Sequence, residues 1–163
     1  MKAPKTYSII LMGVAGSGKT TIGKELESLL GYKFHDADDF HSPKNINKMK
    51  NGIALTDNDR SDWLAELNDL LIDHEPIILA CSALKSKYRY ILAKNTKCRF
   101  IYLKISINAV VLRLKARSGH YFNTSLIETQ FSTLEEPKTC IVIDAEKSVS
   151  EIISNIKSKL AYQ

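Results

Sequence analysis

One segment constrains this chain more than any other, because it fits G-x-x-x-x-G-K-[ST], the pattern of a phosphate-binding loop. It reads Gly13-Val14-Ala15-Gly16-Ser17-Gly18-Lys19-Thr20. Its glycines let the backbone adopt dihedrals that a Cβ would penalise, so successive N–H groups can surround phosphate oxygens. Lys19 supplies a positive charge to the β- and γ-phosphates, and the Thr20 hydroxyl is a ligand for Mg²⁺. We therefore predict a site for ATP and Mg²⁺ at this loop.

The residues on either side supply the strand and the helix that such a loop requires. Residues 7–12 form a short apolar run, which is typical of a buried parallel strand. After Lys19 the apolar residues recur at helical spacing, and Gly31 is expected to end the helix. A phosphate held by the loop then lies at the helix N-terminus, where N–H groups and the helix dipole favour an anion. We expect nucleotide contacts from the whole loop and from Thr21, which follows it.

The composition indicates one soluble domain. The chain has 163 residues, of which 44% are hydrophobic and 25% charged, and its apolar runs are shorter than a membrane span. The apolar run near the N-terminus is too short for the core of a signal sequence. We therefore expect a cytoplasmic protein without a membrane partner, in which residues 1–163 form a single domain.

The charge and the cysteines argue against several other classes of protein. The net charge is +5, but no dense basic run is present, so we expect no nucleic-acid partner. A solvated surface with a cationic site for an anionic ligand accounts for this charge. Cys81, Cys98 and Cys140 are odd in number and lie beside apolar runs, which favours buried thiols over a disulfide framework or a metal site.

Aspartates follow the second predicted strand, residues 32–35. Asp36 and Asp38 then lie at the carboxyl end of a parallel strand, where open α/β sheets bind their ligands. Neighbouring carboxylates repel one another unless a cation is close, and Mg²⁺ with Lys19 provides one. Because no aspartate ends the third predicted strand, Asp36 is the expected metal-side carboxylate. An exposed acidic turn or a helix cap is the alternative interpretation.

Residues 38–73 are predicted to form a helical insertion that binds the acceptor substrate. One helix begins at Ser42-Pro43, and a second is capped by Asp57 or Asp59. Polar side chains of this segment are candidates for holding an anionic or polyhydroxyl substrate; they are His41, Lys44, Lys48 and Arg60. A single lysine is more often solvated surface, and pairing of Arg60 with an aspartate stays open.

Strands continue to alternate with helices through the rest of the chain. Further strands are expected at residues 76–80, 98–104 and 141–144, and further helices at 86–95, 108–117 and 149–160. The alternation predicts an α/β, three-layer P-loop kinase fold, in which a five-stranded parallel sheet is flanked by helices.

A lid is predicted at residues 117–135. Arg113 and Arg117 are spaced i, i+4 at the end of a predicted helix, and a polar, glycine-bearing break follows at 118–123. A flexible loop after these arginines can bring cations onto a phosphate during its transfer. The alternative is an ordinary surface loop whose arginine stems cover apolar surface.

Several motifs follow one another in a fixed order over residues 7–144. They are Gly13 to Thr20; Asp36-x-Asp38 followed by His41; Asn45-x-x-Lys48-Met49-x-x-Gly52; Leu55-x-Asp57-x-Asp59-Arg60-x-x-Trp63-Leu64; Cys81-Ser82-Ala83-Leu84-Lys85-x-x-Tyr88-Arg89; Arg113-Leu114-x-x-Arg117-x-Gly119-His120; and Gln130-Phe131-x-x-Leu134-Glu135-x-Pro137. In this order they resemble the gluconokinase family, within the shikimate-kinase and nucleoside-monophosphate-kinase group of P-loop folds. Ala37 and Ser42 depart from the family pattern, in which glycine and proline are common at those places.

This resemblance implies ATP-dependent phosphorylation of D-gluconate on its terminal hydroxyl, which gives 6-phospho-D-gluconate, and a homodimer in many members. Taken with the loop chemistry, it implies that Lys19 holds the β- and γ-phosphates and that Mg²⁺ lies on Thr20 and Asp36. Asp38 then orients the attacking hydroxyl and accepts its proton, while Arg117, together with Arg113, neutralises charge during transfer. The expected gluconate contacts are Asp38, His41, Lys48, Arg60, Arg89 and His120.

Other functions are weighed against this one. Shikimate kinase, or another small-hydroxyacid kinase, usually has a glycine-rich turn after the third strand, where this chain has Cys81-Ser82-Ala83. A non-catalytic nucleotide-binding switch of the GTP type calls for an Asn-Lys-x-Asp signature, but the Asn47-Lys48 pair is followed by Met49-Lys50. A nucleic-acid kinase is disfavoured because no basic stripe with interleaved aromatic residues is present.

Overall fold

The structure, a computed structural model, describes residues 7–73, 75–118 and 124–162. A five-stranded sheet runs through its centre in the order β2-β3-β1-β4-β5, and all neighbouring strands are parallel. The strands are β1 (Ser8–Met12), β2 (Phe34–Asp36), β3 (Ile78–Ala80), β4 (Cys98–Lys104) and β5 (Ile141–Asp144). The predicted α/β fold with five parallel strands is therefore confirmed.

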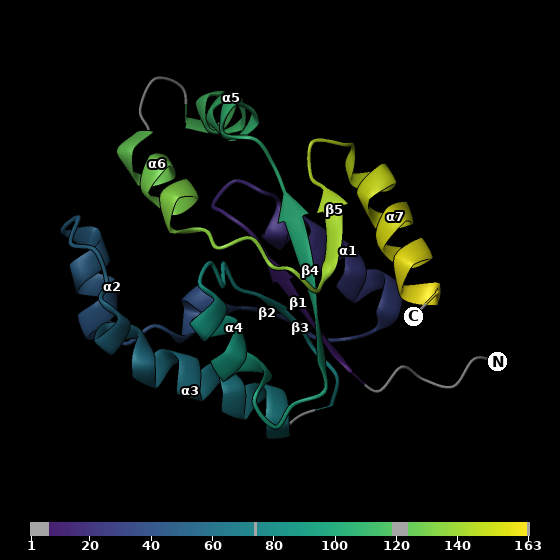
Figure 1. Cartoon of the computed structure of the whole chain (residues 1–163), viewed down its shortest axis with the longest axis horizontal. Helices are drawn as coiled ribbons and strands as arrows, with labels where there is room; N and C mark the ends of the chain where they lie inside the picture. Colours follow the sequence, from purple (N-terminus) through teal and green to yellow (C-terminus); the bar gives the residue numbers. More distant parts are fainter. Residues whose placement is uncertain (1–6, 74, 119–123, 163) are drawn as a thin grey trace.

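Helices cover both faces of the sheet and form the two outer layers (Figure 1). They are α1 (Lys19–Leu30), α2 (Pro43–Lys50), α3 (Asp57–Asp73), α4 (Ser86–Ala93), α5 (Ile107–Ser118), α6 (Thr124–Thr133) and α7 (Val149–Ala161), with a 3₁₀ turn, η1 (Ala37–Phe40). Side chains of α1 and α7 pack with one face of the sheet, and those of α3 and α4 pack with the other. Among the described residues no helix is long and apolar enough to cross a membrane.

Strand β1 contributes to the core on both faces, because successive side chains of a strand point to opposite sides. Ile9 and Leu11 lie in the cluster with α1 and α7, whereas Ile10 and Met12 lie in the cluster with α3 and α4. At most 1% of any of these side chains is exposed. Burial on both faces explains the continuous apolar sequence and fixes the start of the loop that follows.

Helix α1 crosses β2 at very close range. A Cβ on Gly23 would lie 2.2 Å from the Phe34 ring, so only glycine allows this approach. The helix ends where the sequence predicts, since Gly31 has a φ of 70° and donates its N–H to the Glu27 carbonyl oxygen at 2.9 Å. In the sheet β3 lies between β1 and β2, so the ends of these three strands lie in a row.

Some predicted details differ from the structure. Strand β2 extends to Asp36, beyond the predicted 32–35. Helix α3 is capped by Thr56 rather than by Asp57 or Asp59: the Thr56 hydroxyl accepts the Asp59 N–H at 3.1 Å, and the Asp59 carboxylate accepts the Thr56 N–H at 2.9 Å. The reciprocal pair satisfies two backbone donors at once, which a lone aspartate does not.

The cysteines are free thiols, as predicted, but only one of them is fully buried. Cys81 is buried at the end of β3, whereas Cys98 and Cys140 are half-buried. Burial raises the pKa of the Cys81 thiol to about 12, so it stays protonated and packs as a small apolar side chain.

Candidate active site

The phosphate-binding loop joins the buried end of β1 to the first turn of α1. Gly13, Gly16 and Gly18 have φ values of 145°, 81° and 98°, a range that favours glycine. A Cβ on Gly13 would also lie 2.9 Å from both the Leu103 carbonyl oxygen and Ser17 Oγ. Glycine is therefore required here for conformation and for space, as the motif predicts.

Polar groups of the loop are placed as an anion site requires. The Lys19 ammonium folds back and donates to the carbonyl oxygens of Gly13 and Val14 at 2.9 and 3.0 Å. Ser17 Oγ is buried and has no hydrogen-bond partner within the described part of the chain. Burial lowers the pKa of Lys19, and an anion beside it favours the charged form again. The loop therefore fits the phosphates of a nucleotide.

Gln130, on α6, accepts a hydrogen bond from one of the backbone N–H groups of the loop. Its Oε1 accepts a hydrogen bond from the Ala15 N–H at 2.6 Å. A carboxamide oxygen thus takes a place that a phosphate oxygen can take on such a loop. The sequence shows Gln130 only as part of a motif, because 115 positions separate it from Ala15.

Asp36 connects the end of β2 to the phosphate-binding loop. Its Oδ2 accepts a hydrogen bond from Thr20 Oγ1 at 3.3 Å, and its Oδ1 accepts the Asp38 N–H at 3.0 Å. The second contact caps η1, so the helix-cap interpretation of the aspartates also describes part of this geometry. Among the described residues no group of three or more His, Cys, Asp or Glu side chains could hold a metal ion. One hydroxyl and one carboxylate still suit Mg²⁺, which keeps water and phosphate oxygens as its other ligands.

Asp38 lies on η1, two residues after Asp36. Its side chain is 86% exposed, whereas His41 behind it is 5% exposed. The His41 ring stacks on Trp63 with 4.3 Å between centroids, and Trp63 Nε1 donates to the Ala37 carbonyl oxygen at 2.7 Å. Protein surrounds the Asp38 carboxylate without covering it, and this partial desolvation, followed by the charge of Asp36, raises its pKa. An open carboxylate of raised pKa on a rigid support can accept a proton.

Two of the predicted substrate-binding cations make contacts within the insertion. Lys48 Nζ lies 2.8 Å from both carboxylate oxygens of Asp59 and so ties α2 to α3. Arg60 Nη1 donates to the Leu55 carbonyl oxygen at 2.6 Å and to the Tyr88 hydroxyl at 3.4 Å. Within the described residues Arg60 forms no salt bridge with an aspartate, and its other N–H groups remain available as donors.

Arg89 supports the loop that follows β3. Its Nη1 donates to the carbonyl oxygens of Ala83 and Leu84 at 2.8 and 3.1 Å, and its Nη2 donates to the Glu135 carbonyl oxygen at 2.9 Å. Glu135 adds two further hydrogen bonds. Its N–H donates to the Leu84 carbonyl oxygen at 2.8 Å, and its carboxylate accepts the Ser86 N–H at 2.7 Å. Ala83 has a φ of 45°, which is uncommon for a residue with a Cβ. These contacts give Arg89 a supporting role that the sequence does not predict.

The predicted lid is described only in part. Arg113, on α5, donates to the Gly16 carbonyl oxygen at 3.2 Å and also contacts the Ala145 carbonyl oxygen, so it reaches the phosphate-binding loop as expected. Arg117, one turn later, is exposed. His120 and the rest of residues 119–123 lie outside the described residues.

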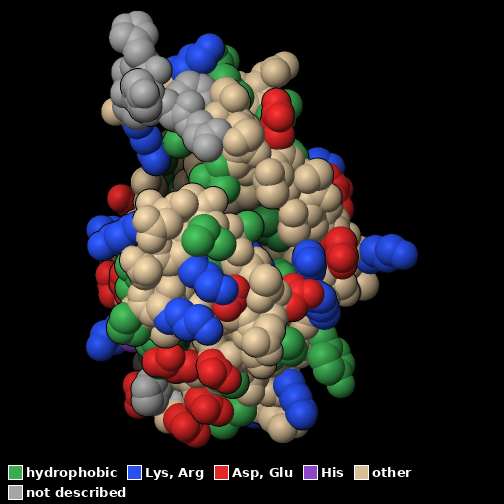
Figure 2. All heavy atoms as spheres, turned by 90° about the vertical axis from the view of Figure 1, so that its left-hand side faces the viewer, with side chains coloured by type: hydrophobic (Ala, Val, Ile, Leu, Met, Phe, Trp, Pro, Cys, Tyr) green, Lys and Arg blue, Asp and Glu red, His purple; other side chains and the backbone are tan. Residues whose placement is uncertain are grey.

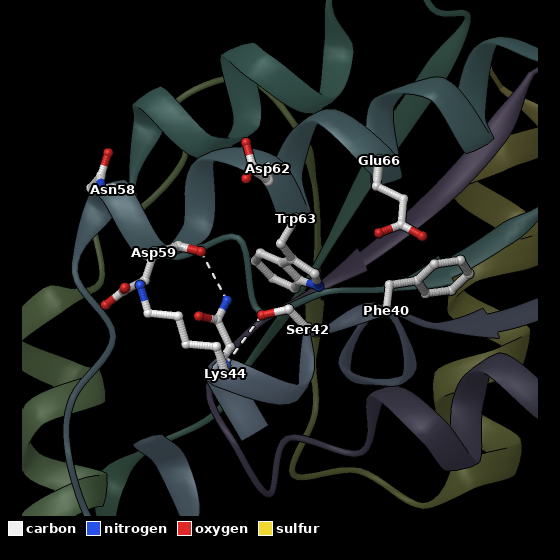
Figure 3. Close-up of a pocket in the computed structure, with 9 residues that line it drawn as sticks. Phe40, Ser42, Lys44, Asn58, Asp59, Asp62, Trp63 and Glu66 are labelled. Carbon is white, nitrogen blue, oxygen red and sulfur yellow. Dashed lines mark hydrogen bonds between the residues drawn. The ribbon is translucent and has the colours of Figure 1, made fainter. Parts of the chain in front are cut away.

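A hollow of about 220 Å³ lies on the insertion, between α2 and α3 (Figure 3). Lys44 is part of its wall, together with the acidic side chains of Asp59, Asp62 and Glu66. Figure 2 shows acidic side chains gathered at the lower end of one face of the molecule. The exposed acids of α3 beyond its first turn are Asp62, Glu66, Asp69 and Asp73. This charge disfavours an anionic ligand, so the acceptor site is better placed at the carboxyl edge of the sheet.

Comparison with known proteins gives one consistent result at the level of sequence. The family model described as shikimate kinase matches residues 15–161. A probable gluconokinase of Mus musculus is 38% identical, in an alignment that covers 98% of this chain and all 100% of the relative. The thermoresistant gluconokinase of Escherichia coli (strain K12) is 39% identical, with coverage of 90% of this chain and 89% of the relative.

Solved structures agree with the sequence comparison. A gluconokinase from Sinorhizobium meliloti 1021 superimposes with a TM-score of 0.89 and is 38% identical, covering 96% of this chain and 93% of its own. A shikimate kinase from Bacteroides thetaiotaomicron has a TM-score of 0.71 at 16% identity, over 96% of this chain and 99% of its own. The second likeness shows the fold alone.

Proposed function

Because the chain belongs to the gluconokinase family, we propose that it transfers the γ-phosphate of ATP to the terminal hydroxyl of D-gluconate and makes 6-phospho-D-gluconate. The observation that carries this proposal is the meeting of a phosphate-binding loop and an open carboxylate at one edge of the sheet. Asp36 links the two, because its carboxylate accepts hydrogen bonds from Thr20 Oγ1 of the loop at 3.3 Å and from the Asp38 N–H at 3.0 Å. Kinase chemistry needs this pairing of a phosphate cradle with a base.

At the phosphate end, the loop residues and Thr21 bind the nucleotide. Lys19 exchanges its present contacts with the Gly13 and Val14 carbonyl oxygens for oxygens of the β- and γ-phosphates. Arg113 approaches from α5, and Arg117 comes onto the transferring phosphate when residues 117–135 close as a lid. Thr20 and Asp36 hold Mg²⁺, which neutralises charge on the phosphates when it is bound.

At the acceptor end, Asp38 orients the terminal hydroxyl of gluconate and accepts its proton. The hydroxyl oxygen forms a bond to the γ-phosphorus as the bond from that phosphorus to the bridging oxygen breaks, and ADP leaves. His41 supports this arrangement, because its ring stacks on Trp63 and its Nε2 lies 3.9 Å from Asp38 Oδ1; it stays a predicted substrate contact.

Residues 38–73 form the substrate-binding insertion in this proposal, with Arg60 as its main cation. Lys48 and Arg89 contribute by holding the walls of the site, since their present contacts are with Asp59 and with backbone carbonyls. His120 stays a predicted substrate contact. The single domain, the homodimer and the cytoplasmic location also stay predictions, which rest on the sequence and the family resemblance.

The experiment that tests this function is a coupled ADP-release assay over D-gluconate, shikimate and AMP. We expect kcat/KM for D-gluconate to exceed the other values by at least about 10³, because a site built to bond hydroxyls and a carboxylate rejects molecules that leave those groups unpaired. An enzyme that releases ADP with shikimate and not with gluconate contradicts the proposed acceptor. The phosphate-binding loop would still be that of a kinase.

A further inference from the structure

The cations of the phosphate-binding loop, the insertion and α4 differ in whether their N–H groups already donate hydrogen bonds. Lys19 donates to loop carbonyls, Lys48 to Asp59 and Arg89 to three backbone oxygens. The ammonium of Lys85, the residue before α4, makes no hydrogen bond to any described residue. This ammonium has three donors and no acceptor capacity, so it lacks the partners that its neighbours have.

Lys85 is also held back from solvent. Its side chain is 32% exposed, and its closest anion is Asp57 Oδ1 at 3.6 Å. Asp57 is already engaged, because both Lys87 Nζ and the Tyr88 hydroxyl donate to its carboxylate. Those hydrogen bonds hold the pKa of Asp57 well below its usual range. Lys85 therefore shares this anion with two other donors.

The surroundings of Lys85 carry an excess of positive charge. Arg60, Lys85 and Lys87 lie 5.6, 5.7 and 5.9 Å from the centre of the Tyr88 ring. Burial, then the hydrogen bond to Asp57, raises the pKa of Tyr88 to about 12, so the phenol stays neutral. Among the described residues, Asp57 is the carboxylate that pairs with Lys85 and Lys87. Together with Arg60 these cations outnumber it, so the group keeps a positive charge. Such a group attracts an anion of small size.

This cluster of Asp57, Arg60, Lys85, Lys87 and Tyr88 lies at the catalytic edge of the sheet. Lys85 follows the loop after β3, and the Ser82 carbonyl oxygen in that loop accepts the Gly13 N–H of the phosphate-binding loop at 3.2 Å. The rest of the cluster belongs to the first turns of α3 and α4. The cluster therefore lies at the same edge of the sheet as the phosphate-binding loop.

We propose that Lys85 binds the carboxylate of the acceptor and is the residue that selects an acid over an uncharged polyol or amide. The proposal rests on the proposed function, since gluconate carries its carboxylate at the end opposite the reacting hydroxyl. Arg60 and Lys85 lie at similar distances from the centre of the Tyr88 ring. In this proposal Arg60 also approaches the carboxylate of the acceptor. Lys87, which is 54% exposed and paired with Asp57, contributes only to the general field.

The test compares D-gluconate with D-gluconamide, in which a neutral amide replaces the carboxylate, at saturating ATP. Lys85→Met should lower kcat/KM for gluconate by about 10- to 100-fold, the size of a hydrogen bond to a charged group. The value for gluconamide should change by no more than about threefold, because the amide never had the charge-assisted contact. Lys85→Arg should restore most of the preference for the acid.

Lys87→Met is the matched control, and it should leave the gluconate to gluconamide ratio within about threefold of wild type. Equal losses for both substrates in Lys85→Met give Lys85 a structural role and overturn the proposal. An equal effect of Lys87→Met assigns the preference to bulk charge and overturns it as well. If the wild-type chain turns over no gluconate, the proposed function fails at that first measurement, and the role of Lys85 falls with it.

Discussion

The two ends of the proposed catalytic site are built from different kinds of group. At the phosphate end the donors are backbone N–H groups and one lysine, fixed between the buried strand β1 and helix α1. At the acceptor end the polar groups are side chains that bond to one another, as Lys48 does with Asp59 and Arg60 with Tyr88. A backbone site binds the same group whatever the acceptor, whereas a side-chain site depends on which contacts each cation keeps. The phosphate end therefore governs whether transfer occurs, and the acceptor end governs which molecule receives the phosphate.

The largest effect is expected where the two ends meet. Asp38→Asn should lower kcat by about 10²-fold or more, because an amide cannot accept the hydroxyl proton, while ATP affinity stays nearly unchanged. Asp36→Asn should instead raise the Mg²⁺ concentration needed for half-maximal rate, since it removes a carboxylate beside Thr20. Steady-state kinetics over a Mg²⁺ series separates the two. Identical Mg²⁺ dependence in both variants and wild type contradicts this division of roles.

The phosphate end alone is tested by Lys19→Ala. Turnover should fall on the order of 10²-fold, because the lysine stabilises charge that develops on the phosphate during transfer. The melting temperature should change little, since the side chain contacts only loop carbonyls. Lys24→Ala, an exposed lysine on the same helix, is the control and should behave as wild type. Near-full turnover by Lys19→Ala would remove the basis for the phosphate-binding assignment.

The acceptor end is tested by two arginines with different roles. Arg60→Ala should raise KM for gluconate about tenfold and leave KM for ATP unchanged, because its available donors face the acceptor side. Arg89→Ala should also impair gluconate kinetics, but with a loss of roughly 1–3 kcal/mol in stability, since it removes a donor from the part-buried carbonyl oxygens of Ala83 and Leu84. Thermal melting of both variants, together with their KM values for gluconate and for ATP, separates a substrate-binding role from a supporting role. If Arg89→Ala melts as wild type does, its contacts with the loop after β3 are not what stabilises that loop.

The sequence predicts the phosphate end far better than the acceptor end, for a physical reason. Gly13, Gly18 and Lys19 act within one short segment, so their spacing alone encodes the geometry of the backbone. The partner of Lys48 could not be read in this way, since Asp59 also reads as a cap of its own helix. The same holds for Arg89 and Glu135, which meet only because α4 and the segment after α6 are neighbours in space.

The positions of the strands were predictable for a related reason. Residues 98–104 and 141–144 were predicted as strands with the bounds that the structure has, because each is a short run rich in apolar residues. Cap and loop details were less predictable. The left-handed backbone of Ala83 has no sequence signal, since alanine rarely adopts a φ of 45°.

The contact between Gln130 and Ala15 joins α6, which is part of the predicted lid, to the phosphate end, and it yields the smallest predicted effect. The Gln130 carboxamide competes with a phosphate oxygen for the Ala15 N–H, because a single N–H donor can serve only one acceptor well. A neutral hydrogen bond is worth about 1 kcal/mol, which corresponds to about a fivefold change in affinity.

Gln130→Ala should therefore bind ADP about fivefold more tightly than wild type in calorimetry without gluconate, since nucleotide no longer displaces an internal acceptor. Gln130→Glu should bind ADP more weakly, because its carboxylate competes more strongly and repels phosphate. Thr129→Ala, which alters a neighbouring exposed side chain of α6 bonded to the Ser125 carbonyl oxygen, is the control and should match wild type. Weaker ADP binding by Gln130→Ala would make Gln130 a ligand of the nucleotide rather than its competitor. The side chain would then belong with the backbone donors of the phosphate end.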